Sequence, residues 1–132
     1  MARKKRQSKL NFPFTAMPKH ITRSDAWFSC RPAARLIWFA VLERFDGANN
    51  GAISLSVREA AKYAGCSPNT AGRMFDELID AGLLICSQTS SFNSGKRLAR
   101  LWELTHLPKE GKVATNLWKK ISAKASSKRD TI

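Results

Sequence analysis

A short stretch near the middle of the chain carries polar side chains whose types suit the recognition of a polyanion. These polar residues are Ser67, Asn69, Thr70 and Arg73. Hydroxyl, amide and guanidinium groups are short or forked hydrogen-bonding groups, which suit base edges and phosphates. Arginine pairs best with guanine and asparagine with adenine, so we expect Arg73 and Asn69 to contact bases. Ser67 and Thr70 are expected to hold phosphates.

Two short helices joined by a tight turn are predicted to position these groups. Ser56 and Glu59 have the spacing of a capping box, which begins the first helix. Gly65 ends it, because glycine takes a left-handed C-cap without a steric cost. Ser67 begins the second helix as an N-cap, with Pro68 at the first helical position.

The second helix is predicted to run to Gly82 and to be amphipathic. The apolar residues expected to face inward at helical spacing are Ala71, Met74, Phe75, Leu78 and Ile79. The residues expected on its outer face are Ser67, Asn69, Thr70, Gly72, Arg73, Asp76 and Glu77. On the first helix, Arg58 and Lys62 are expected outside, where they would hold phosphates.

The run Ser-Pro-Asn-Thr-Ala-Gly-Arg-Met-Phe-Asp-Glu-Leu-Ile-Asp-Ala-Gly-Leu-Leu, at 67–84, resembles the recognition helix of bacterial winged helix-turn-helix proteins of the GntR-like and MarR-like kind. The resemblance covers about residues 29–107. It implies an α+β, mainly α fold in which the second helix enters the DNA major groove. The alternative is an ordinary helical hairpin with a polar, solvent-exposed surface.

The flanking segments are predicted to complete that fold within a domain of residues 23–107. We expect a helix at 32–45, introduced by a short helical turn from Ser24 that brings Trp27 and Phe28 against the core, and a short strand at 52–55. Strands at 83–88 and 98–104 enclose a polar loop, which is the pattern of a two-stranded β wing. Lys96 and Arg97 in this loop are predicted to contact phosphate or the minor groove, although a hairpin loop can carry such residues without a function.

The net charge of +13 is concentrated at the two ends of the chain. Residues 1–24 contain seven Lys or Arg and no acid, residues 25–107 have a net charge of +1, and residues 108–132 have a net charge of +5. Basic arms of this kind supply affinity for nucleic acid. The contacting residues predicted in the arm are Arg3, Lys4, Lys5 and Arg6. A solubilising tail is the alternative, and a membrane surface fits less well because no segment approaches about twenty apolar residues.

The regions outside the domain are predicted to be a basic arm and lead-in at 1–22 and a tail at 108–132. Prolines in the lead-in argue against a regular helix at 11–22. In the tail, a linker precedes an amphipathic helix at 113–125 with Leu117, Trp118 and Ile121 inward. Trp118 would either fold back on the domain or meet a second copy of the chain, so a homodimer stays open.

Enzymatic chemistry has little support in the sequence. Three cysteines without a Cys-x-x-Cys pair argue against a disulfide framework and a structural zinc, and they are expected to be buried or half-buried. His20 and His106 look too isolated to complete a site. We therefore expect no enzyme activity, no metal and no cofactor. The N-terminus lacks a secretory signal, so a cytoplasmic, nucleoid-associated protein is expected.

Together these patterns predict a sequence-specific double-stranded DNA-binding protein of bacterial, plasmid or phage type, acting as a small transcriptional regulator. Two alternatives stay open. The first is an architectural role in plasmid or phage replication initiation or excision. The second is a winged helix that uses its recognition face to bind a protein partner.

Overall fold

The chain forms α-helices and a small three-stranded antiparallel sheet, so the predicted α+β, mainly helical class is confirmed. The computed structural model describes residues 11–89, 91–93 and 96–121, and it describes no side chain of the strand residues between 91 and 98. The helices are α1 (Lys19–Thr22), α2 (Asp25–Ser29), α3 (Pro32–Glu43), α4 (Val57–Ala64), α5 (Pro68–Asp80) and the 3₁₀ helix η2 (Leu117–Ile121). The strands are β1 (Ile53–Ser54), β2 (Leu84–Gln88), β3 (Ser91–Asn93), β4 (Lys96–Leu98) and β5 (Leu101–Leu104).

The ends of α4 and α5 follow from local sequence signals. The capping box is present, since Ser56 Oγ accepts the Glu59 N–H at 3.1 Å and Glu59 Oε1 accepts the Ser56 N–H at 3.0 Å. Gly65 adopts a φ of 72° at the end of α4. Ser67 caps α5, and Gly82, at φ 76°, lies just beyond its end. These four boundaries confirm the predicted pair of short helices.

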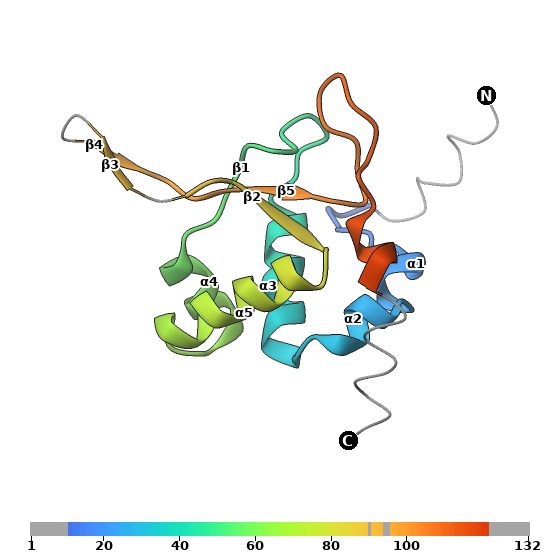
Figure 1. Cartoon of the computed structure of the whole chain (residues 1–132), viewed down its shortest axis with the longest axis horizontal. Coiled ribbons are helices and arrows are strands. Elements are labelled where there is room, and N and C mark those ends of the chain that lie inside the picture. The colour runs from blue at the N-terminus through green and yellow to red at the C-terminus, as the bar shows by residue number, and fades with distance from the viewer. Residues whose placement is uncertain (1–10, 90, 94–95, 122–132) are drawn as a thin grey trace.

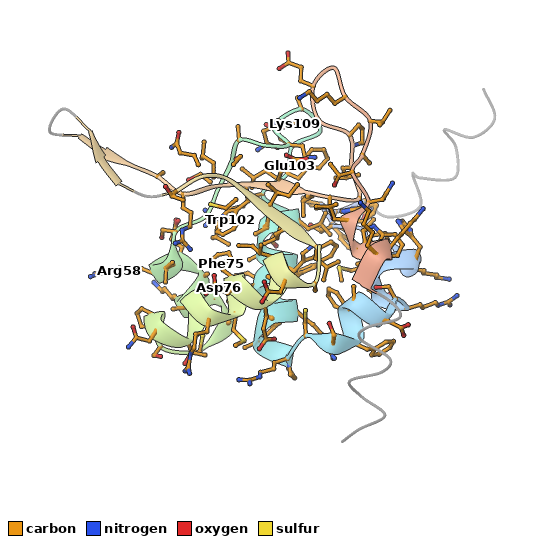
Figure 2. The ribbon with its side chains drawn as sticks, viewed as in Figure 1. Arg58, Phe75, Asp76, Trp102, Glu103 and Lys109 are labelled. Atoms are coloured by element: carbon orange, nitrogen blue, oxygen red, sulfur yellow. The ribbon has the colours of Figure 1, made fainter. Side chains whose placement is uncertain are left out.

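A core of aromatic and aliphatic side chains fills the space between the helices and the sheet. Phe75 of α5 and Trp102 of β5 are fully buried, and their rings stack with centroids 4.2 Å apart and planes inclined by 9° (Figure 2). Trp102 Nε1 donates to the Leu55 carbonyl at 3.0 Å, which satisfies its polar atom. An aromatic pair of this kind contributes roughly 0.5–1.5 kcal/mol beyond its area burial. The stack therefore fixes α5 to the sheet.

The inward side of α5 is narrower than predicted. Ala71, Met74, Phe75 and Leu78 are buried, as expected, but Ile79 is 38% exposed. Successive helix residues are rotated by about 100°, so Ile79 lies beyond the side that faces α3, α4 and the sheet. The prediction for Ile79 was wrong.

The sheet has the order β1-β5-β2, and all its neighbouring strands are antiparallel. The register between β2 and β5 shifts between Cys86 and Gln88, which marks a bulge. Beyond it, β3 and β4 form a separate two-stranded ribbon, and Figure 1 shows this ribbon projecting past the helices. None of the described helices is long and apolar enough to cross a membrane.

The lead-in contains a short helix that the sequence did not predict. Pro18 is the N-cap of α1, so it lies outside the helix, where its missing N–H costs nothing. Ser24 caps α2, as predicted, by accepting the Trp27 N–H at 3.1 Å. Trp27 packs against the core, whereas Phe28 is 48% exposed, contrary to expectation.

The predicted helix at 113–125 was also wrong. Helical structure begins only at η2, and Val113 is 85% exposed. Asn116 has a φ of 50°, outside the right-handed helical region, and its N–H donates to the Thr105 carbonyl at 2.8 Å. This long-range bond ends the extended chain and starts η2. Residues 122–125 lie outside the described part of the chain.

The segment of η2 folds back on the domain, as one of the two alternatives for Trp118 predicted. Trp118 is 7% exposed. The backbone of Leu117 approaches the end of α5 so closely that a Cβ at Gly82 would lie 2.6 Å from the Leu117 carbonyl oxygen. Thr105 Oγ1 donates to the Gly82 carbonyl at 2.6 Å and secures the same corner.

Candidate nucleic-acid interface

The first turns of α5 carry a chain of linked polar side chains. Ser67 Oγ accepts the Thr70 N–H at 3.1 Å and donates to Thr70 Oγ1 at 3.0 Å. Arg73 Nη2 lies 3.5 Å from Thr70 Oγ1 and points toward the start of the helix. The Ser67 hydroxyl is thus engaged in capping, while the Thr70 hydroxyl proton stays available to an outside acceptor.

Asn69 and Arg73 form the part of α5 best suited to reading bases. Both residues are exposed, and they are four positions apart, so they lie on the same side of the helix. Among the described residues, the Asn69 amide has no hydrogen-bond partner. Two forked hydrogen-bonding groups are therefore presented side by side.

The outer side of α4 adds positive charge. Arg58 and Lys62 are exposed and are also four positions apart. Figure 2 shows Arg58 extending away from α4 on the side of the molecule from which the β3–β4 ribbon projects. Exposed arginine and lysine side chains of this kind suit contact with phosphates.

The second half of α5 has a different character. Asp76 and Asp80 are exposed, and their carboxylates disfavour phosphates. Glu77, which was expected on the outer face, turns instead toward α3: its Oε1 accepts the Arg31 N–H at 3.0 Å, and its Oε2 lies 3.1 Å from Arg31 Nε. Its outward placement was wrong, because the sequence did not show that the start of α3 would pass this residue. On α5 itself, the one basic residue, Arg73, lies in the first half of the helix.

Several predicted contacts fall where the structure gives no side chains. The backbones of Lys96 and Arg97 pair with those of Asn93 and Phe92 in the β3–β4 ribbon. The sequence predicted a polar loop here, so that prediction was wrong: backbone hydrogen bonds between strands do not depend on apolar side chains, and the pairing continues into the polar segment. The side chains of Lys96 and Arg97 lie outside the described part. The arm residues Arg3, Lys4, Lys5 and Arg6 also lie outside it.

Arg100 is a candidate that sequence reasoning did not single out. Its guanidinium carbon lies 5.9 Å from the centroid of Phe75 and 5.5 Å from that of Trp102. Its position close to Lys96 and Arg97 could have drawn attention to it. Trp102 is only two positions away, but the contact with Phe75 joins residues distant in sequence. Arg100 therefore joins the set of cations near α5.

The two histidines are brought together, contrary to the prediction that they are isolated. The rings of His20 and His106 have centroids 6.2 Å apart, and His106 lies 5.4 Å from Trp38. Burial, with a smaller contribution from His20, lowers the pKa of His106 from 6.5 to about 4. In the part of the chain that the structure describes, no three His, Cys, Asp or Glu side chains gather as a metal site requires.

The cysteines are packing residues, as expected. Cys30 is buried, Cys66 and Cys86 are half-buried, and all three are free thiols. Burial raises the pKa of the Cys30 thiol to about 11, which keeps it protonated and unreactive.

The chain was also compared with known proteins. No protein-family model, no curated protein and no solved structure matches it. The geometry of α4, α5 and the ribbon therefore carries the functional argument.

Proposed function

We propose that this chain is a sequence-specific double-stranded DNA-binding protein of the winged helix-turn-helix kind, acting as a small transcriptional regulator. The observation that carries the proposal is the exposed pair Asn69 and Arg73 on the first turns of α5, beside the exposed cations Arg58 and Lys62 of α4. Base-reading and phosphate-holding groups are thus adjacent on one rigid pair of helices.

The order of elements supports the same proposal. A short strand, β1, precedes α4, and a strand, a projecting ribbon and a returning strand follow α5 directly. The resemblance to winged helix-turn-helix proteins implies a strand, a loop and a returning strand after the second helix, and here the β3–β4 ribbon takes the place of that loop. The stacking of Phe75 on Trp102 holds α5 against the strand that leads out of the ribbon, so helix and ribbon would meet DNA as one unit.

In the proposed complex, α5 lies in the major groove with its N-terminal half toward the bases. Arg73 pairs with guanine and Asn69 with adenine. Arg58, Lys62 and Thr70 hold the phosphates that flank the groove. The ribbon and the basic arm contact the adjacent backbone and supply affinity that depends on salt.

A selection from random duplex DNA at physiological salt tests the proposal. We expect a sharp motif, and the spacing of any repeated half-sites would give the number of copies bound. The matched control is the double variant Asn69→Ala, Arg73→Ala, which should lose or change the motif while remaining folded.

Two results would contradict the proposed role as a transcriptional regulator. Binding without a motif that disappears as salt rises would favour an architectural role in replication or excision, with repeated adjacent footprints. An absence of DNA binding, together with a protein complex that Arg73→Ala disrupts, would favour a protein-binding winged helix.

A further inference from the structure

Arg100 lies where the β3–β4 ribbon joins the body of the domain. It occupies the short connection between β4 and β5. Its carbonyl accepts the N–H of Leu55 at 3.4 Å, and Leu55 directly precedes Ser56, the N-cap of α4. The positive end of the α4 dipole is therefore close to this residue.

A rigid aromatic platform lies beneath the guanidinium. Phe75 and Trp102, whose stacked rings are fully buried, both lie within 6 Å of the Arg100 guanidinium carbon, at 5.9 and 5.5 Å. Cations are attracted to the faces of aromatic rings at such distances. Since the two rings cannot move without disturbing the core, the platform restricts the position of the guanidinium.

Among the described residues, no acceptor pairs with the charge of Arg100. Its Nε is buried and forms no hydrogen bond, and no ion pair joins its guanidinium to an acid among the described residues. By contrast, Arg44 reaches Glu59 at 3.3 Å and the Ser54 carbonyl at 2.9 Å. A partly buried donor without an acceptor is unfavourable, and such groups in folded proteins call for an explanation.

We propose that Arg100 binds a phosphate of the DNA backbone at the base of the ribbon. This inference rests on the proposed function and adds one specific contact to it. The planar guanidinium presents several donors in a fixed fork that matches phosphate oxygens, and the residue is only partly buried, so a ligand in solution can reach it. A backbone that passes between the start of α4 and the ribbon would meet Arg58 and Arg100 in succession.

Variants of Arg100 test the contact by the salt dependence of binding to the duplex motif selected with the full chain. Arg100→Met keeps an unbranched stem on the aromatic rings and removes the charge. We expect it to weaken binding roughly tenfold at low salt and to reduce the slope of log K against log salt by about one phosphate contact. Arg100→Lys keeps the charge and should retain most of the slope.

The matched control is Arg23→Met, which removes an exposed arginine at the end of α1, on the far side of the domain from the ribbon (Figure 1). It should leave the slope unchanged. Thermal unfolding of each variant reports whether it is folded. If Arg100→Met does not fold, Arg100→Gln replaces it, and the same fall in affinity and slope is expected.

The outcomes separate this contact from the proposed function. If Arg100→Met binds with the affinity and slope of the parent while Arg73→Ala weakens binding, the phosphate contact is overturned and the DNA-binding function stands. If the parent chain binds no duplex DNA, both proposals fail. If the slope falls for Arg100→Met and not for Arg23→Met, the contact is supported.

Discussion

Glu77 of α5 is bonded through both carboxylate oxygens to Arg31, the residue directly before α3. Its Oε1 accepts the Arg31 backbone N–H at 3.0 Å, and its Oε2 lies 3.1 Å from Arg31 Nε. Arg31 is the N-cap of α3 and offers no side-chain cap of its own. A carboxylate 46 positions away binds the backbone N–H and the side chain of this N-cap residue, and so ties α5 to the start of α3.

Replacing this carboxylate should destabilise the fold. Glu77→Ala removes both the hydrogen bond to the Arg31 N–H and the ion pair, and we expect the free energy of unfolding to fall by about 1–2 kcal/mol. Urea unfolding monitored by tryptophan fluorescence measures the change. Asp76→Ala, at the exposed neighbouring position, is the control and should change stability by less than about 0.5 kcal/mol. If Glu77→Ala and Asp76→Ala changed stability equally, the bonds between Glu77 and Arg31 would contribute nothing to it.

Two glycine-to-alanine substitutions associated with α5 should have opposite signs. At Gly82, φ is +76° and a Cβ would lie 2.6 Å from the Leu117 carbonyl oxygen, so Gly82→Ala should cost about 2 kcal/mol or more. At Gly72, a Cβ would meet nothing within 4 Å, and Gly72→Ala should stabilise the helix by roughly 0.5–1 kcal/mol. Thermal unfolding of the pair gives the comparison. A neutral Gly82→Ala would mean that η2 leaves the end of α5 readily.

Stability should fall as the pH is lowered below neutral because of His106. In the unfolded chain its imidazole takes up a proton near the ordinary pKa of 6.5, whereas in the folded protein it does so only near a pKa of about 4. Between these values the unfolded state binds more protons, so acidification favours unfolding. Denaturant unfolding at pH 7.5 and pH 5 measures the difference.

The control for this pH dependence is His106→Gln, which cannot titrate in that range. The variant should show a smaller loss of stability between the two pH values than the parent chain. An identical loss in both proteins would assign the effect to other groups.

Arg73→Ala should affect recognition more than stability. On a specific site we expect a loss of about 1–3 kcal/mol in binding free energy and relaxed preference at one base pair. Fluorescence anisotropy with the selected duplex and with single-base variants of it measures both quantities. An equal loss of affinity for every duplex sequence would show that Arg73 contacts a phosphate and not a base.

Removal of the basic arm should have the complementary effect. Deleting residues 1–9 takes away five Lys or Arg residues and should weaken binding to all sequences alike, with a flatter dependence on salt. The same anisotropy series measures it. A change in the preferred sequence would instead mean that the arm reads bases.

Features that depend on neighbouring residues could be predicted from the sequence. The capping box of Ser56 and Glu59, the N-cap at Ser67 and the glycines that end both helices each require only a few adjacent residues. The helical spacing of apolar residues, together with the capping residues, therefore predicted the pair of helices and the buried positions from Ala71 to Leu78. Alternation and turn residues also predicted strands on either side of the ribbon, but not the ribbon itself, whose residues were expected to form a polar loop.

Features that depend on distant contacts could not be predicted. The partner of Glu77 is 46 positions away, and the rings beneath Arg100 belong to α5 and β5. The expected helix at 113–125 had suitable apolar spacing, but a hydrogen bond from Asn116 to Thr105 prevailed over that local preference. The proximity of His20 and His106 likewise depends on a contact between residues distant in sequence.

The outward side of the first turns of α5 has little part in holding the fold together. Asn69 and Arg73 are exposed, and within the described chain the Asn69 amide has no partner and Arg73 reaches only Thr70. The cap, the apolar stripe and the bond to α3 use other positions of the same helix. Exchanges at 69 and 73 are therefore nearly neutral for folding, so descendants of a duplicated gene can diverge in what they bind by single mutations while keeping one scaffold.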